Sequence, residues 1–164
     1  MNNHMNKPLK VTYITLLALL ISACGSAQLR VPEISELEGS PAGIEIVKSA
    51  LNQLGRPYLY GGNTPKGFDC SGLIEYSHSR IGVYTPRNTY NQFRESSPVK
   101  LSALRAGDLI FFRISRNKVN HVGIYMGRGF FIHSPSTGKK VSIKNLASPY
   151  WQKRVLGAGR YYKI

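Results

Sequence analysis

Apolar residues between Ile44 and Leu54 recur at helical spacing. Ser40 is a good N-cap and is followed by Pro41, a residue favoured at the first helical position. Gly55 is a typical stop, so a helix is predicted between these residues. Its apolar positions are Ile44, Val47, Leu51 and Leu54.

A second helix is predicted from Cys70 to Ile81, after a loop over residues 56–68 that is rich in Gly, Asn, Pro and Lys. Asp69 would be its N-cap and Gly82 would end it. His78 lies two turns after Cys70, where we expect it to face solvent. The expected buried side comprises Leu73, Ile74, Ser77 and Ile81.

After Gly107 the pattern changes from helical spacing to short apolar runs typical of strands. A short turn is expected at residues 149–151. Helices followed by antiparallel strands indicate an α+β domain, and no internal repeat is present. The predicted strands are Leu109–Phe112, Val119–Met126, Phe130–His133, Lys140–Ile143 and Arg154–Tyr162.

Two of these strands form a hairpin if residues 127–129 are its loop. In that register His121 and His133 share a face as diagonal neighbours, about 7–8 Å apart at the backbone, and Gly123 leaves room between them. The same register buries an apolar set on the other face. That set is Val122, Ile124, Met126, Phe130 and Ile132. Two unrelated polar residues on a half-exposed strand remain the alternative.

The N-terminus has the three parts of a secretory signal. Lys7 and Lys10 precede an apolar run, and small residues follow it. The apolar stretch covers only residues 11–23, whereas a membrane-spanning helix needs about 20 residues. Residues 1–23 are therefore predicted to be a signal peptide.

The end of this segment, residues 21–24, is similar to the bacterial lipobox, in which the cysteine is acylated and becomes the mature N-terminus. Cys24 would then carry the lipid, palmitate included. Several acyl chains anchor a protein firmly. Residues 24–40 are predicted to be a lipidated tether and 41–164 the folded domain. Gly25, rather than Asp, favours the periplasmic face of the outer membrane.

The charge is strongly positive, with 22 Lys and Arg against 8 Asp and Glu, a net charge of +14. From Tyr76 onward there are 16 basic residues and only two acids, Glu95 and Asp108. Such a field favours an anionic partner. Charge alone leaves open nucleic acid, an anionic membrane, an acidic wall polymer, or a basic surface kept for solubility.

The chain has two cysteines, so acylation of Cys24 would leave Cys70 without a disulfide partner. An unpaired thiol in an exported protein is a candidate nucleophile, although most free cysteines are small buried apolar residues. The start of a helix favours thiolate over thiol and can lower the thiol pKa to between about 3.5 and 7.5. A histidine pair could supply a base and a residue that orients it.

Several segments, in this order and at these spacings, together resemble the NlpC family of bacterial cell-wall peptidases. The resemblance covers residues 42–162, and it is specific because many motifs agree. The matching segments are Arg56-Pro57-Tyr58-Leu59-Tyr60-Gly61-Gly62, Gly67-Phe68-Asp69-Cys70-Ser71-Gly72, Pro86-Arg87-Asn88-Thr89, Gly107-Asp108-Leu109-Ile110-Phe111-Phe112, Asn120-His121-Val122-Gly123-Ile124-Tyr125 and Phe131-Ile132-His133-Ser134.

The resemblance implies a minimal papain-like fold that hydrolyses peptide bonds in peptidoglycan stem peptides through a thioester. It makes Cys70 the nucleophile, His121 the base and His133 the orienting residue. It also places four residues at the substrate groove: Tyr58, Asp69, Ser71 and Arg87, the last of which could instead anchor its loop. It implies no metal, no cofactor and no nucleic acid, and we expect a monomer in the cell envelope.

Two other functions stay open at this point. One is a non-enzymatic peptidoglycan-binding envelope protein that keeps the fold. The other is an amidase or acyl transferase built on the same residues, because a fold does not fix a function.

Overall fold

The structure is a computed structural model that describes residues 1, 30–115 and 118–163. The predicted signal peptide and the predicted lipidation site Cys24 fall at residues outside this described part. Within it, no helix has the length and apolar character needed to cross a membrane.

Helix α2, Pro41–Leu51, begins as predicted. The Ser40 hydroxyl accepts a hydrogen bond from the N–H of Gly43, and the helix has proline in its first turn. It ends three residues before the predicted end. The predicted apolar face is only partly right, because Val47 is buried whereas Leu54 is 44% exposed. The buried positions include two small residues that a search for large apolar side chains omits: Gly43, Ile46, Val47 and Ala50.

Helix α3, Cys70–Ser79, also begins where predicted, with Asp69 as its N-cap. Gly82 follows it with a φ of +73°, a conformation that favours glycine. The expectation that His78 faces solvent is wrong, because this side chain is fully buried and its Nδ1 lies 2.9 Å from the carbonyl of Ile74. The hydrogen bond to its own helix satisfies one ring nitrogen, which makes this burial tolerable.

The main sheet has six antiparallel strands in the order β3-β8-β4-β5-β6-β7. Two strands have the predicted bounds and three differ by a few residues at their ends. The short strand β3 and the helix α4 were not predicted. The elements are α4 Thr89–Glu95, β3 Ser97–Val99, β4 Leu109–Phe112, β5 His121–Gly127, β6 Phe130–His133, β7 Ser142–Asn145, α5 Pro149–Gln152 and β8 Val155–Arg160.

The remaining elements are short. A two-stranded hairpin, β1 Asn63–Thr64 and β2 Gly67–Phe68, interrupts the predicted loop before α3. Two 3₁₀ turns, η1 Ile34–Glu36 and η2 Leu101–Ala103, lie elsewhere on the chain. Beside η1, Leu37 is buried in the main core and the carbonyl of Glu38 accepts a hydrogen bond of 3.1 Å from the N–H of Ala106.

The predicted β5–β6 register holds in the middle of the hairpin, where Ile124 pairs with Ile132 and Tyr125 with Phe131. Nearer the turn it shifts, and Gly127 rather than Met126 lies opposite Phe130. The loop is therefore two residues long, Arg128-Gly129, and both have positive φ, 51° and 80°. This combination of φ angles is typical of tight hairpin turns.

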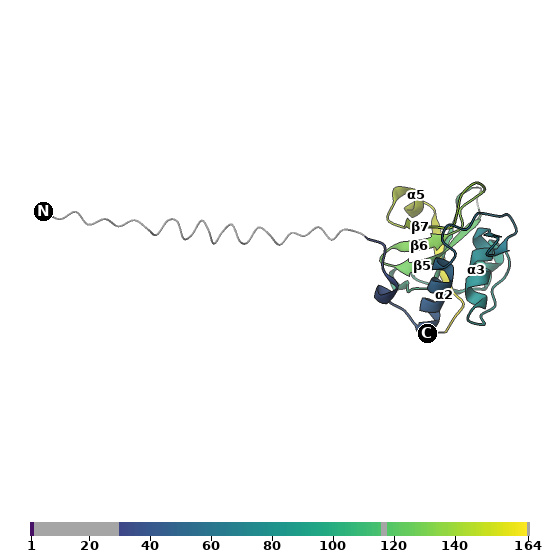
Figure 1. The fold of residues 1–164 in the computed structure, drawn as a ribbon, viewed down its shortest axis with the longest axis horizontal. Coiled ribbons are helices and arrows are strands. Elements are labelled where there is room, and N and C mark those ends of the chain that lie inside the picture. Colours follow the sequence, from purple (N-terminus) through teal and green to yellow (C-terminus); the bar gives the residue numbers. More distant parts are fainter. Residues whose placement is uncertain (2–29, 116–117, 164) are drawn as a thin grey trace. The chain divides into compact units, whose positions relative to one another are not determined.

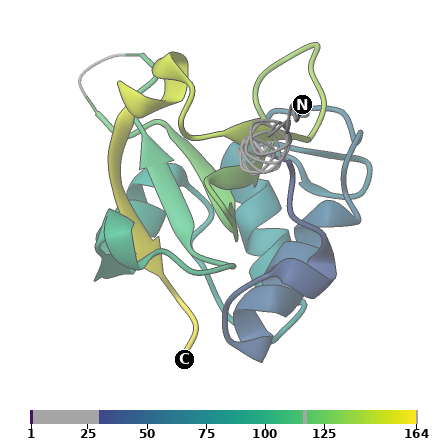
Figure 2. The same ribbon diagram turned by 90° about the vertical axis from the view of Figure 1, so that its left-hand side faces the viewer.

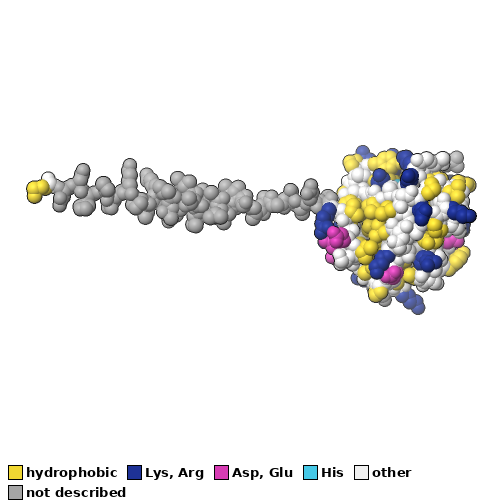
Figure 3. Space-filling view, in the orientation of Figure 1, with side chains coloured by type: hydrophobic (Ala, Val, Ile, Leu, Met, Phe, Trp, Pro, Cys, Tyr) yellow, Lys and Arg dark blue, Asp and Glu magenta, His cyan; other side chains and the backbone are white. Residues whose placement is uncertain are grey.

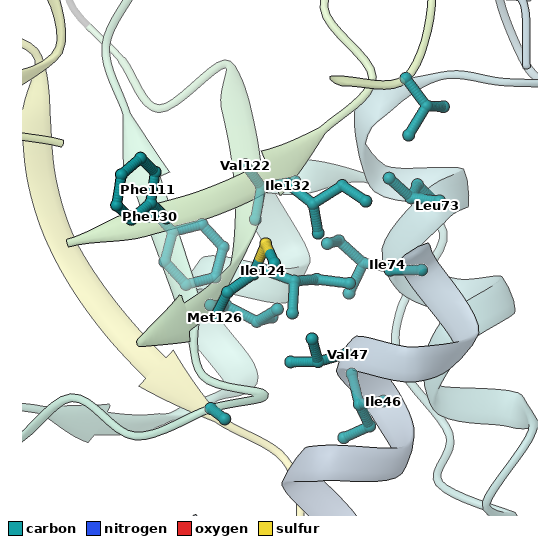
Figure 4. Packing of buried hydrophobic residues seen from close by; sticks show 14 of the residues in the cluster. Ile46, Val47, Leu73, Ile74, Phe111, Val122, Ile124, Met126, Phe130 and Ile132 are labelled. Atoms are coloured by element: carbon teal, nitrogen blue, oxygen red, sulfur yellow. The ribbon is translucent and has the colours of Figure 1, made fainter. Parts of the chain in front are cut away.

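Helices α2 and α3 cover one face of the sheet (Figures 1 and 2). Figure 4 shows the core between these layers, with Ile46, Val47 and Ile74 directed toward side chains of the strands. The strand residues in this core include the whole apolar set predicted from the hairpin: Val122, Ile124, Met126, Phe130 and Ile132.

The opposite face of the sheet is also buried. A second cluster forms around Ile110, Phe112 and Phe131, and Trp151 of α5 covers it. The structure thus confirms the α+β prediction. The face that carries the histidines is buried and not half-exposed. Residues 149–152, where only a short turn was expected, form α5 and place Trp151 over this face.

Candidate active site

Cys70 is the first residue of α3 and lines a groove in which it stays partly exposed. The Asp69 carboxylate fixes this helix start by accepting a 2.7 Å hydrogen bond from the N–H of Gly72. The Cys70 sulfur lies 3.5 Å from the hydroxyl of Thr89. The backbone N–H groups of Ser71 and Val122 lie close enough to the sulfur to favour the thiolate. The proximity of Val122 places the thiol beside the start of β5.

Burial raises the pKa of the Cys70 thiol above its ordinary value. The Thr89 hydroxyl opposes this shift, the Asp69 carboxylate adds to it, and the N–H groups of Ser71 and Val122 oppose it. The lowering expected from the helix start is therefore outweighed by desolvation. A thiol of this kind depends on a neighbouring base to give up its proton.

That base is available next to Val122. His121 opens β5 and His133 closes β6, and the Nε2 of His121 lies 2.7 Å from the Nδ1 of His133. The two rings are 4% and 1% exposed. Burial lowers the pKa of His121 to about 4, so the ring is neutral at neutral pH and can accept a proton.

The hydrogen bond between the rings limits which tautomers allow His121 to act as a base. For the free Nδ1 of His121 to accept a proton, its Nε2–H must donate to the Nδ1 of His133. His133 then carries its own proton on Nε2, an atom that is buried and has no hydrogen-bond partner among the described residues. Burial, His121 and the charges of Lys144 and Lys139 together lower the pKa of His133 to about 2, which keeps this ring neutral as well.

Trp151 is a site residue that sequence reasoning missed. Its ring stacks on His121 at a centroid distance of 5.8 Å and stands perpendicular to His133 at 5.1 Å. It therefore shields the hydrogen bond between the histidines from water. Ser148-Pro149, a common pair at helix starts, was the available signal that residues 149–151 form more than a turn.

Three of the predicted groove residues form a single network beside Cys70. Arg87 donates to both carboxylate oxygens of Asp69, at 2.9 and 2.8 Å, and to the hydroxyl of Ser71 at 3.0 Å. Asp69 also accepts from the N–H of Gly61 at 3.0 Å. The charges of Arg87 and Asp69 thus neutralise one another, and both residues hold the helix start in place. This supports the anchoring role for Arg87.

Gly72 allows a loop of the chain to pack against the first turn of α3. A Cβ at this position would collide with the carbonyl oxygen of Gly62. The chain's own loop fills that space and brings Gly61 and the groove wall against the helix.

The groove has a volume of about 420 Å³. Both Cys70 and Tyr58 line it, and the resemblance had placed Tyr58 at the substrate groove. Burial raises the pKa of Tyr58, with a smaller contribution from Cys70, so its hydroxyl remains a donor. The lining residues are Tyr58, Tyr60, Gly61, Asp69, Cys70, Ser71, Arg87, Asn88, Thr89 and Asn120.

No group of three or more His, Cys, Asp or Glu side chains in the described part of the chain is arranged to hold a metal ion.

These features define an α+β domain with a thiol at a helix start. The thiol lies near Val122, and the preceding residue, His121, is hydrogen-bonded to a second histidine of the sheet. The model of the NlpC/P60 family matches residues 55–160, and the chain belongs to this family. It is 42% identical over 115 residues to the murein DD-endopeptidase MepH of Escherichia coli K12, covering 67% of this chain and 42% of that protein.

A second relative is the γ-D-glutamyl-L-lysine dipeptidyl-peptidase of Bacillus subtilis 168, 36% identical over 120 residues, covering 72% of this chain and 40% of that protein. The crystal structure of an NlpC/P60 family protein from Bacillus cereus superposes with a TM-score of 0.71 at 32% identity. The match covers 81% of this chain and 44% of that one. The chain thus spans less than half the length of these relatives.

Proposed function

We propose that this protein is a cysteine-type endopeptidase that hydrolyses peptide bonds in peptidoglycan stem peptides or their cross-links. The main support is the neutral, buried His121–His133 pair, joined at 2.7 Å, since His121 directly precedes Val122, whose N–H lies near the Cys70 sulfur. Family membership supports the same assignment, because relatives carry the names of peptidoglycan endopeptidases. Tyr58, Asp69 and Ser71 would form the groove wall that the substrate meets.

The reaction follows from the protonation states. The Nδ1 of His121 takes the Cys70 proton as the sulfur attacks the peptide carbonyl. The oxyanion that forms is stabilised by N–H groups at the start of α3 and by the Tyr58 hydroxyl. The carbon–nitrogen bond breaks, and the nitrogen takes the proton from His121 and leaves as an amine.

A thioester between the acyl fragment and Cys70 remains. Water attacks it after giving a proton to His121, the carbon–sulfur bond breaks, and the acid product leaves. The proton on His121 returns to the thiolate, which restores the starting state. His133 keeps the His121 ring oriented through both halves of the cycle.

The proposal extends to the location of the enzyme. Cleavage after residue 23 and acylation of Cys24 would leave residues 24–40 as a lipidated tether and 41–164 as a monomeric catalytic domain in the cell envelope, on the periplasmic face of the outer membrane. Labelling of the expressed protein with an alkyne fatty acid tests this. Wild type should be labelled and Cys24→Ala should not, whereas labelling that survives the substitution would contradict the anchor.

Digestion of purified peptidoglycan tests the enzymatic activity. Wild type should release new muropeptides, and Cys70→Ala should release none, since the substitution removes the thiol that forms the thioester. Ser79→Ala, at the far end of the same helix, is the matched control and should digest normally. Mass spectrometry of the products names the bond, which separates a D-alanyl–diaminopimelate cross-link from a γ-D-glutamyl–diaminopimelate bond.

The same assay decides between functions. Wild-type protein that sediments with peptidoglycan but releases nothing would point to a non-enzymatic envelope protein. Release of free glycan strands or transferred acyl groups would point to an amidase or transferase. Identical products from wild type and Cys70→Ala would overturn the proposal.

A further inference from the structure

A second and larger cavity, of about 660 Å³, is lined by the histidine pair, which does not line the thiol groove. His121, His133 and Trp151 form part of its wall, and neither Cys70 nor Tyr58 lines it. No residue that lines it is an aspartate or a glutamate. It is therefore a cavity next to the candidate base, without acidic side chains in its lining, and distinct from the groove lined by Cys70.

Three lysines line this cavity: Lys139, Lys140 and Lys144. Lys144 pairs with Phe131 in the β6–β7 ladder, and Ser142 pairs with His133, so Lys144 and His133 lie on the same face of the sheet. No ion pair forms at any of the three lysines within residues 30–115 and 118–163. In the groove, by contrast, Arg87 is already paired with Asp69.

The backbone that carries these lysines is fixed. The carbonyl of Lys139 accepts a 2.9 Å hydrogen bond from the N–H of Tyr58, and Lys140 forms a bridge with Pro57. The Lys139 and Lys144 charges are close enough to His133 to lower its pKa. Figure 3 shows Lys and Arg side chains spread over one face of the domain, which is the ordinary arrangement for a basic surface.

The unsatisfied Nε2 of His133, on a side chain that is only 1% exposed and lines the cavity, is an independent sign of a ligand. In the tautomer that the proposed mechanism requires, His121 donates to the Nδ1 of His133, and this Nε2 is then a hydrogen-bond donor without an acceptor among the described residues. A buried donor left unpaired costs about 1–3 kcal/mol. A carboxylate in the cavity supplies both an acceptor for this donor and a counter-charge for the lysines.

The reaction determines which part of a substrate reaches this side. In the proposed reaction the acyl fragment stays on Cys70, whereas the amine fragment takes its proton from His121 and is therefore formed beside that histidine. The amine fragment of a cut peptide contains its C-terminal end, and in a stem peptide its diamino acid has a carboxylate of its own. A negative charge therefore accompanies this fragment.

We propose that the cavity lined by Lys139, Lys140 and Lys144 is a subsite for the carboxylate of the amine-side diamino acid of an acidic stem peptide. The inference rests on the proposed function and adds to it the charge of the residue on the amine side of the cut bond. It makes a carboxylate-bearing stem peptide a better substrate than the same peptide with a carboxamide at that position.

The test uses two synthetic stem peptides cut at the bond that the peptidoglycan digest identifies, one with the free carboxylate and one with the carboxamide. Wild type should favour the carboxylate in kcat/KM by roughly tenfold or more, the range of one charge-assisted hydrogen bond. The variant with Lys139, Lys140 and Lys144 changed to Gln should bring this ratio close to one. Added salt should reduce the wild-type ratio, because exposed lysines are screened.

The matched control changes Lys66, Lys100 and Lys163 to Gln, which removes the same charge from three exposed lysines outside the cavity. It should keep the wild-type ratio. Equal use of both peptides by wild type, or a preference that survives in the cavity variant, would overturn the subsite and leave the proposed function standing. If wild type cuts neither peptide, the proposed function itself fails and the inference falls with it.

Discussion

At the scale of single residues, the site combines a thiol that is hard to ionise with a base that is hard to protonate. Desolvation raises the pKa of Cys70 and lowers that of His121 to about 4. Both groups are therefore uncharged at rest. The ion pair forms only as the proton moves, when groups that stabilise the thiolate have the most effect.

Thr89 is one such group, since its hydroxyl lies 3.5 Å from the Cys70 sulfur. We predict that Thr89→Val, which keeps the shape of the side chain, raises the thiol pKa and lowers kcat/KM by roughly tenfold. The measurement is the pH dependence of alkylation by iodoacetamide. Thr89→Ser should restore the wild-type curve, and an unchanged curve in Thr89→Val would contradict the role.

At the scale of elements, the start of α3 carries the site. The Asp69 carboxylate caps the helix and also binds Arg87 through both oxygens. Its two tasks can be separated, because an asparagine keeps a capping oxygen but cannot form the ion pair.

We predict that Asp69→Ala lowers the free energy of unfolding by about 1–2 kcal/mol, the usual cost of losing a cap. Asp69→Asn should lose less, because the surviving cap outweighs a partly exposed ion pair. Urea titration followed by circular dichroism provides both values. A larger loss in Asp69→Asn than in Asp69→Ala would show that the ion pair, and not the cap, secures the helix.

Alternation along β5 and β6 was sufficient to predict the face that carries both histidines, because a one-residue slip would have exposed the apolar set. Helix caps such as Ser40 and Asp69 were equally local signals. Helix α4 was missed because only Gln92 of its seven residues is buried. The burial of His78 and the position of Trp151 depend on packing between distant segments, which a pattern along the chain does not record.

At the scale of the whole molecule, the C-terminal end of the domain is tied to its centre by a buried carboxylate. Asp108 is fully buried, and Arg160 binds both of its oxygens at 2.6 and 2.7 Å. The hydroxyl of Tyr162 donates to it at 3.0 Å, and the N–H of Arg105 donates at 2.8 Å. A motif that the sequence offered only as a family block is thus a structural anchor for β8.

The stability of the whole domain should depend on pH through its buried histidines. Burial lowers the pKa of His78 to about 4 from an ordinary value of 6.5. Between these values the unfolded chain binds more protons than the native one, so stability falls as the pH falls through this window. We predict a loss of up to about 3 kcal/mol from this residue alone.

The measurement is urea unfolding at several values between pH 7 and pH 4. His78→Gln cannot titrate in this range, and its stability should vary less steeply with pH than that of wild type. Ser79→Ala, at the end of the same helix, is the control and should keep the wild-type slope. An equal slope in His78→Gln and wild type would show that folding leaves the pKa of His78 unchanged, and would contradict the prediction.

The nucleophile belongs to the helical layer and the histidines to the sheet, with the main core between these layers (Figure 4). Cys70 is separated from His121 by about a third of the chain, and no local segment contains both. A newly made or partly unfolded chain therefore carries a thiol without its base. Under the proposed mechanism such a chain would have no hydrolytic capacity until the layers dock, so completion of folding would itself be the step that activates the catalyst.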